Sequence, residues 1–156
     1  MAAVASATAV TAVTRTSALV GTWKLVSFEQ WSDGNVTYPM GRDARGYISY
    51  DPHGRMSVQI MRTDRPALAA GKWSESTIDE LKAAVGGYLS YAGTYVVDEP
   101  QASVTHHIDV HLLPNAVGTR LERRFEVDGN RLTLHTSPHA SSERPEGGRL
   151  IWERVE

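Results

Sequence analysis

The sequence predicts an all-β protein: a closed antiparallel up-and-down β-barrel of about eight to nine strands with one short α-helix. From Leu19 onward, short segments of alternating apolar and polar residues follow one another, separated by turns rich in Gly, Asn, Asp and Pro. A single interruption has helical periodicity instead. So many consecutive hairpins must hide their sheet edges, and closure into a barrel does this without the long crossovers of a two-sheet sandwich.

Three strands are expected in the first half of the domain. The segments, with the turns that end them, are WKLVSFEQW with Ser32-Asp33-Gly34-Asn35, GYISY with Asp51-Pro52-His53-Gly54, and RMSVQIMR with the stretch from Asp64 to Pro66. Each is β-branched or aromatic and alternates in polarity, which is typical of a half-buried strand.

The interruption predicts a helix from Ser76 to Val85. The sequence Ser76-Thr77-Ile78-Asp79 has the pattern of a capping box, and Ile78, Leu81, Ala84 and Val85 fall on one helical face before Gly86-Gly87 ends it. We expect this helix to lie over the open end of the barrel as a lid or to pack on its outside.

The strand pattern then resumes to the end of the chain. Its segments are YLSYAGTYVVD, SVTHHIDVHLL, TRLERRFEV with the turn Asp128-Gly129-Asn130, RLTLH, a polar loop rich in Ser and Pro, and RLIWERV. An antiparallel barrel of about eight strands either fills with side chains or encloses one small ligand.

Length and composition indicate one globular domain, residues 19–156, preceded by a flexible Ala-, Val- and Thr-rich tail, residues 1–18. The chain has 156 residues, 41% of them hydrophobic and 22% charged, with a formal net charge of −2. Neither a basic stripe for nucleic acid nor an apolar run long enough to span a membrane is present. The tail lacks the basic start and unbroken apolar run of a signal peptide, so we expect a cytoplasmic protein. The sequence does not indicate an oligomeric state.

The two ends of the domain carry a family resemblance. Gly21-Thr22-Trp23 opens the first strand and Trp152-Glu153-Arg154 closes the last. With LVGTWKLVSFE, YPMGRDARGYISYDPHGRMSVQ, GYLSYAGTY, VTHHI and LIWERV, the chain resembles the bacterial and fungal lipocalin-like domain family of the calycin superfamily along residues 19–155. The resemblance implies that Trp23 closes one end of the barrel and that Arg154 stacks over it, as a cation–π contact allows. It also implies an apolar small-molecule ligand or a role in biosynthesis.

Alternation assigns the side chains of the segment VTHHIDVHLL to the two faces of one strand. Val104, His106, Ile108, Val110 and Leu112 share the apolar face, which should point inward, whereas Thr105, His107, Asp109 and His111 share the outer face. His107 and His111 are then roughly 13 Å apart along the strand, too far to share a metal ion. No metal site is therefore expected here.

The next strand places Arg123 inward beside His106, with Leu121, Phe125 and Val127. An arginine inside a barrel needs an acceptor, because burying an unpaired charge costs several kcal/mol. Two interpretations stay open: an internal ion pair, with Glu29 as the candidate carboxylate because alternation puts it on the face of Trp23, or recognition of an anionic group of a ligand.

The remaining candidate ligand contacts come from inward positions and from tyrosines that could present a hydroxyl to a cavity. Together with His106, Arg123 and Glu29 they are Tyr47, Tyr50, Met56, Val58, Ile60, Tyr91, Tyr95, Ile108 and Phe125. Gly93, between two tyrosines, leaves room for a ligand or for a sharp bend. A barrel filled by these side chains is the alternative. No phosphate-binding glycine motif is found and no histidine is set apart as a haem ligand, so no cofactor is expected.

Two functions fit these observations. The first is binding of an apolar, partly oxygenated small molecule in the barrel cavity. The second is a cofactor-free isomerase, cyclase or dehydratase acting on a polyketide- or terpenoid-like substrate, in which His106 moves a proton and Arg123 stabilises an oxyanion. The sequence does not decide between binder and enzyme, and a cavity of about 300 Å³ or more touching His106 would favour a small-molecule site.

Overall fold

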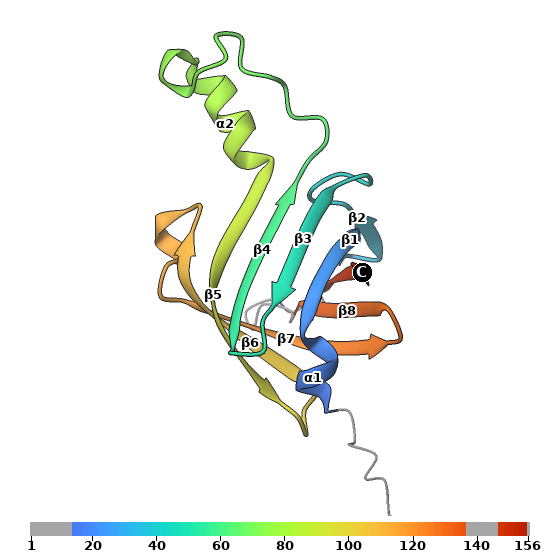
Figure 1. Ribbon diagram of the computed structural model, residues 1–156. Helices are drawn as coiled ribbons and strands as arrows, with labels where there is room; N and C mark the ends of the chain where they lie inside the picture. Colours follow the sequence, from blue (N-terminus) through green and yellow to red (C-terminus); the bar gives the residue numbers. More distant parts are fainter. Residues whose placement is uncertain (1–13, 137–146, 156) are drawn as a thin grey trace, which may run out of the picture.

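Nine antiparallel strands form one sheet in the computed structural model, which describes residues 14–136 and 147–155 (Figure 1). The strands are β1 (Gly21–Ser32), β2 (Asn35–Thr37), β3 (Arg45–Tyr50), β4 (Arg55–Met61), β5 (Tyr88–Asp98), β6 (Ser103–His111), β7 (Arg120–Asp128), β8 (Arg131–Thr136) and β9 (Gly147–Arg154). The helices are α1 (Arg15–Leu19) and α2 (Ile78–Gly86), with short 3-10 turns at Trp73–Glu75 and Pro114–Ala116. Most of the polar loop expected before the last strand lies outside the described residues.

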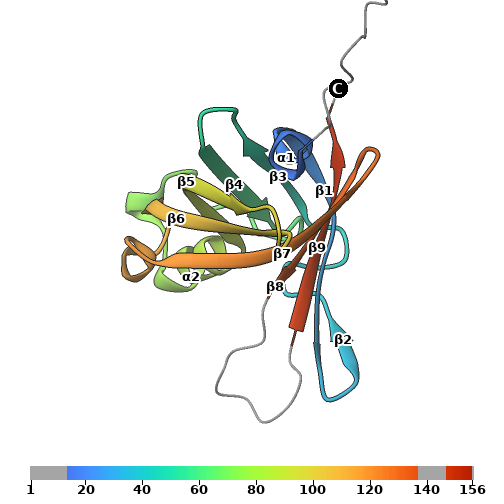
Figure 2. The same ribbon diagram turned by 90° about the horizontal axis from the view of Figure 1, so that it is seen from below.

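The sheet closes into a barrel because β1 pairs with β3 on one side and with β9 on the other. β2 pairs only with the last residues of β1, from Gln30 to Ser32, so it is an extra strand beside a ring of eight. The β1–β2 hairpin projects from one side of the barrel (Figure 2). The predicted up-and-down barrel is confirmed.

One end of the barrel is closed by α1 and by the predicted pair of Trp23 and Arg154. The Trp23 side chain is fully buried, and its indole N–H donates to the Leu19 carbonyl at 2.9 Å. The guanidinium carbon of Arg154 lies 4.0 Å from the centre of the Trp23 ring. Its two terminal nitrogens donate to the carbonyls of Val20 and Ala18 at 2.8 and 2.7 Å. The arginine therefore stacks on the tryptophan as expected and also satisfies carbonyls at the end of α1.

Helix α1 and its cap lie largely within residues 1–18, the segment that was expected to be a flexible tail. The side chain of Thr14 accepts a hydrogen bond from the Ser17 N–H and caps α1. The carboxylate of Glu99, on the β5–β6 connection, accepts from the backbone N–H groups of Arg15 and Thr16. These contacts satisfy free N–H groups of the first turn of α1. Residues 1–13 of the expected tail lie outside the described residues.

Helix α2 lies in the connection between β4 and β5, at the opposite end of the barrel from α1 (Figure 1). Its cap is one residue later than predicted. Thr77 accepts from the N–H of Glu80, and the carboxylate of Glu80 accepts from the N–H of Thr77. This reciprocal pair is the capping box, in place of Ser76 and Asp79. None of the residues of α2 is buried, so its apolar face is turned toward the barrel mouth without being covered.

Side chains fill the middle of the barrel. The interior is apolar apart from the cluster around His106, and Met56, Val58, Ile60, Ile108 and Phe125 are each at most 4% exposed. Leu132 and Leu134 of β8 are buried with them. The filled interior considered from the sequence is therefore found in the middle of the barrel. Open space lies at the end of the barrel near α2.

Candidate functional site

A β-bulge in β6 decides which of its histidines face inward. Ala92 pairs with Val110, but the next residue, Gly93, pairs with Ile108, so Asp109 is an extra residue in the strand. Side-chain alternation reverses after such an insertion. Val104, His106 and Ile108 face inward as predicted, and each is at most 3% exposed.

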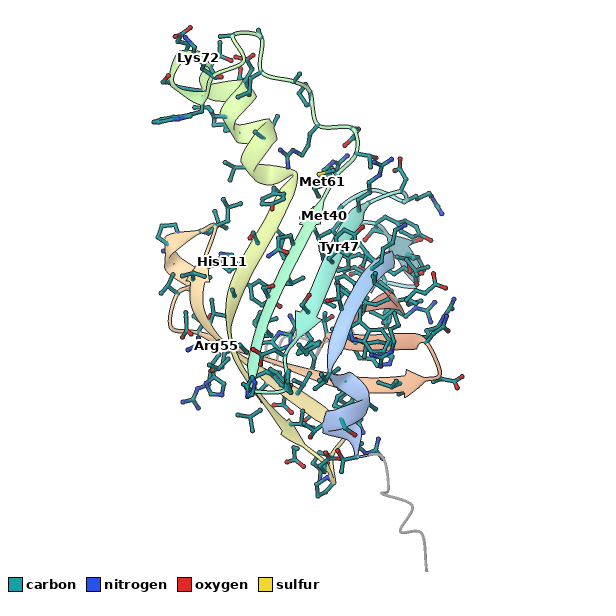
Figure 3. The ribbon with its side chains drawn as sticks, in the orientation of Figure 1. Met40, Tyr47, Arg55, Met61, Lys72 and His111 are labelled. Atoms are coloured by element: carbon teal, nitrogen blue, oxygen red, sulfur yellow. The ribbon has the colours of Figure 1, made fainter. Side chains whose placement is uncertain are left out.

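Beyond the bulge the assignment made by alternation is wrong. Val110 and Leu112, which were expected inside, are 59% and 38% exposed. His111, which was expected outside, pairs with the inward-facing Tyr91 and turns into the barrel mouth. Figure 3 shows its place at the end of β6.

Gly93 is what permits the bulge. A Cβ atom on Gly93 would collide with the backbone carbonyl oxygen of His107 and would lie 2.9 Å from the nitrogen of Asp109. The missing side chain of Gly93 therefore makes room for the backbone of β6, a close approach that was not among the two expectations of a ligand or a sharp bend.

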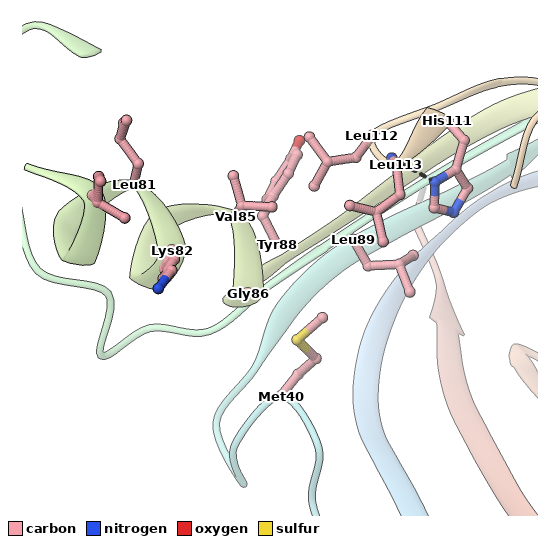
Figure 4. Close-up of a pocket in the computed structure, with 11 residues that line it drawn as sticks. Met40, Leu81, Lys82, Val85, Gly86, Tyr88, Leu89, His111, Leu112 and Leu113 are labelled. Carbon is pink, nitrogen blue, oxygen red and sulfur yellow. Dashed lines mark hydrogen bonds between the residues drawn. The ribbon is translucent and has the colours of Figure 1, made fainter. Parts of the chain in front are cut away.

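A pocket of about 640 Å³ lies where α2 meets the ends of β5 and β6 (Figure 4). Its wall is mostly apolar, and His111, Lys82 and the hydroxyl of Tyr88 are the polar groups of the lining side chains. The lining residues are Met40, Ile78, Leu81, Lys82, Val85, Gly86, Tyr88, Leu89, His111, Leu112 and Leu113. None of them was among the predicted ligand contacts, and His106 does not border the pocket.

The His111 ring is held from two sides. Its Nδ1 accepts a hydrogen bond from the backbone N–H of Leu113 at 2.9 Å. Its face stacks on Tyr91, with the ring centres 5.7 Å apart and the planes 9° from parallel. The ring therefore has a fixed orientation in the wall of the pocket.

Behind Tyr91, a buried cluster joins the pocket wall to the barrel interior. The hydroxyl of Tyr91 lies 3.1 Å from Nδ1 of His106, and the hydroxyl of Tyr50 lies 2.8 Å from Nε2. Because a neutral imidazole has one donor and one acceptor nitrogen, one tyrosine donates to the ring and the other accepts from it. Tyr95 packs edge-on against Tyr50 and donates its hydroxyl to the Asp51 carbonyl at 2.6 Å.

Burial keeps all three members of this cluster uncharged near neutral pH. Burial first, and then the positive charge of Arg123, lowers the pKa of His106 to about 3. Burial raises the pKa of Tyr91 to about 12 and that of Tyr50 well above its ordinary value. His106 is thus a neutral ring with both nitrogens engaged, which makes it a weak base. Its predicted catalytic role, and that of Arg123, stays a prediction.

Arg123 faces the interior as predicted, and it is half-buried. One of its terminal nitrogens donates to the Glu122 carbonyl at 2.9 Å. Within residues 14–136 and 147–155, no carboxylate lies at ion-pair distance from it. Its proposed internal ion pair with Glu29 is therefore not formed, and recognition of a ligand group by Arg123 stays a prediction.

Glu29 was placed on the wrong face because of a second bulge. The register between β1 and β9 shifts between Leu25 and Ser27, so Val26 is the extra residue. After it, Phe28 pairs with the buried Leu150, and Glu29 pairs with Arg149 on the outside. The Glu29 carboxylate accepts from Arg149 Nε at 2.8 Å.

Tyr47 is a further correction. It is 49% exposed and faces away from the interior, because it alternates with the buried Ile48 and with Gly46 along β3 (Figure 3). Tyr50, three residues later, lies on the inner face, so the two tyrosines could not both be inside.

Sequence reasoning missed the residues of this pocket, among them His111, Leu89, Met40 and the apolar face of α2. The glycine in the middle of β5 was the available signal, since it marks the place where the inward and outward faces of β6 exchange.

The described part of the chain contains no group of three or more His, Cys, Asp or Glu placed to hold a metal ion. In those same residues, no helix has the length and apolar character needed to cross a membrane.

Comparisons with known proteins were made on sequence and on structure. A model described as a lipocalin-like domain matches residues 20–155. The chain is similar to a protein of Aspergillus oryzae named as a 4'-hydroxy-3'-methoxypropiophenone carrier protein, with 29% identity over 107 residues, which are 64% of this chain and 96% of that protein. It also matches the crystal structure of a lipocalin-like protein from Bacteroides uniformis at 16% identity and a TM-score of 0.47, over 88% of this chain and 99% of that chain.

Proposed function

We propose, because this chain belongs to the lipocalin-like domain family, that it binds an apolar, partly oxygenated small molecule at the mouth of its barrel. The binding site is the pocket between α2 and the ends of β5 and β6. The observation that carries the proposal is this pocket of about 640 Å³ with its apolar wall. Small-molecule sites typically have about 300–1,000 Å³, an apolar lining and a few fixed polar groups.

The exposed face of α2 supports this site. Ile78 is 71% exposed and Val85 is 43% exposed, and both border the pocket. An apolar ligand in the pocket would remove part of these side chains and of Leu113 from water, which is favourable in proportion to the area covered. The helix would then act as one wall of the site, which agrees with the lid position considered from the sequence.

The relative from Aspergillus oryzae supports the chemical class. The compound in its name has an aromatic ring, a ketone, a hydroxyl and a methoxy group, so it is apolar with a few oxygen atoms. A ligand of this kind fits a pocket whose wall has one histidine, one lysine and one tyrosine among apolar side chains.

Catalysis by His106 is the second candidate, and we place it after binding. A cofactor-free isomerase, cyclase or dehydratase would need His106 to exchange a proton with the substrate. Both ring nitrogens of His106 are instead within hydrogen-bond distance of tyrosine hydroxyls, and the pocket is not bordered by this residue. A binding site requires only the pocket.

The test is titration calorimetry with 4'-hydroxy-3'-methoxypropiophenone and with unsubstituted propiophenone as probes. We expect saturable one-to-one binding of at least one probe. Val85→Asp on α2 places a carboxylate in the apolar wall and should weaken this binding by at least about tenfold, since an unpaired charge loses much of its hydration there.

Val96→Asp is the matched control. Val96 is 60% exposed on the outer face of β5 and does not border the pocket, so this variant should bind as the parent does. The proposed site would be excluded if the parent and Val85→Asp had equal affinities, or if neither probe showed saturable binding to the parent.

A further inference from the structure

The hydrogen bond from Leu113 fixes the tautomer of His111. The backbone N–H of Leu113 can only donate, so Nδ1 of His111, 2.9 Å away, must be the unprotonated acceptor. A neutral imidazole then carries its single proton on Nε2. The stacking on Tyr91 prevents the ring from turning over without losing both contacts.

The resulting Nε2–H donor belongs to the wall of an apolar pocket. Figure 4 shows Nδ1 directed at Leu113 and the second ring nitrogen on the other side of the ring, near Leu89. Among the residues that the structure describes, no side chain or carbonyl accepts from Nε2. Nε2 is not among the buried unpaired atoms, so water can reach it. A ligand that covers it with hydrocarbon would leave the donor without a partner at a cost in free energy, so a ligand that brings an acceptor is favoured there.

We infer that His111 selects ligands with a carbonyl oxygen, which accepts a hydrogen bond from Nε2–H while the rest of the ligand covers Leu89, Leu113 and α2. This inference rests on the proposed function, because it requires that the pocket bind a small molecule. A neutral N–H pairs with a carbonyl oxygen without any charge being buried, so uncharged ketones, aldehydes and esters are the class of ligand. A pure hydrocarbon leaves Nε2–H unpaired. His111 is thus a specificity residue, and Tyr91 and Leu113 are positioning residues.

The test compares propiophenone with propylbenzene, which has the same skeleton without the oxygen. For each protein the ratio of the two dissociation constants is measured by titration calorimetry or by ligand-observed NMR. His111→Phe keeps a ring that can stack on Tyr91 but removes the N–H group. We expect this variant to lose about a fivefold preference for the ketone relative to the parent, the equivalent of one ordinary hydrogen bond.

Two control variants separate this effect from others. His107→Phe changes the histidine on the outer face of the same strand and should keep the ratio of the parent. Lys82→Met removes another donor of the pocket wall and tests whether that donor sets the ratio instead. A ratio that changes in Lys82→Met and not in His111→Phe would overturn the assignment of the donor to His111.

The tautomer has its own readout. Long-range proton–nitrogen NMR spectra of uniformly nitrogen-15-labelled protein distinguish a protonated Nε2 from a protonated Nδ1 in each histidine. We expect His111 as the Nε2–H form, with its nitrogen signal shifted by propiophenone and not by propylbenzene. The Nδ1–H form, or binding of both probes with equal ratios in parent and His111→Phe, overturns the inference and leaves the pocket intact. Failure of both probes to bind the parent overturns the proposed function itself.

Discussion

Arg154 lies over Trp23, with its guanidinium carbon 4.0 Å from the ring centre, and joins the last strand to the first strand and to α1. The pair closes the end of the barrel opposite the pocket. Trp23 is fully buried, so the contact also shields the base of the core. The pocket at the α2 end therefore lies opposite a closed end that contributes none of its lining residues.

Arg154→Ala should destabilise the protein by about 2–4 kcal/mol, because it removes a partly buried cation–π contact and leaves two carbonyls of α1 without their donors. The free energy of unfolding is measured by urea denaturation. Arg45→Ala, an exposed arginine at the start of β3, is the control and should change stability by less than about 0.5 kcal/mol. Equal losses in the two variants would contradict a structural role specific to Arg154.

His106 should make stability fall as the pH decreases from about 6.5 toward 3. Burial and the charge of Arg123 lower its pKa to about 3 in the folded state, against 6.5 in an unfolded chain. Between these values the unfolded chain binds a proton that the folded chain does not. The stabilisation is therefore complete above pH 6.5 and is lost on acidification, at up to about 1.4 kcal/mol per pH unit.

Urea unfolding of the parent and of His106→Gln between pH 7 and 4.5 measures this dependence. The lowered pKa values of the carboxyl groups of Asp51, Glu80 and Glu99 also reduce stability as the pH approaches 4.5, but they act equally in parent and variant. The free energy of unfolding should therefore fall more steeply with decreasing pH in the parent than in the variant. The difference in slope should approach that of one bound proton, about 1.4 kcal/mol per pH unit. Parallel curves would show that His106 is protonated in the folded protein.

Tyr91 serves two neighbours, and Tyr91→Phe separates their roles. Removal of the hydroxyl leaves Nδ1 of the buried His106 without a partner, which should cost about 1–3 kcal/mol. The ring remains available to stack on His111, so the affinity for propiophenone should be unchanged. Tyr47→Phe, on the exposed face of β3, is the control for the loss of a hydroxyl. A large fall in propiophenone affinity without a loss of stability would assign the hydroxyl to the ligand instead.

The fold was predictable because its signals are local. Each strand shows its own alternation and ends in its own turn, and the Trp23–Arg154 pair depends only on the first and last strands. The inner face was predicted correctly up to Ile108 in β6 and up to Leu25 in β1. The assignment of side chains to faces failed at His111 and Glu29. Each of them lies beyond an extra residue, after which inward and outward positions along the strand are exchanged.

The two bulges differ in what the sequence reveals. Gly93, in the middle of β5, marks the first one, since a side chain there would meet the backbone of β6. The second bulge, at Val26, has no comparable signal in the sequence. The helix was predicted from its cap and its periodicity, but its position beside His111 depends on where the chain leaves β4 and enters β5, which is a property of the closed barrel.

Gly93→Ala tests whether this bulge builds the pocket. A Cβ atom would collide with the His107 carbonyl, so β6 must move away or lose its extra residue, at a cost of at least about 2 kcal/mol. Loss of the bulge would restore simple alternation and turn His111 outward, so the preference for propiophenone over propylbenzene should fall together with stability. Gly86→Ala is the control. No atom lies within 4 Å of a Cβ there, and alanine in place of this helical glycine should stabilise by about 0.5–1 kcal/mol. A Gly93→Ala protein with the parent's stability and ketone preference would mean that β6 holds His111 inward without the bulge.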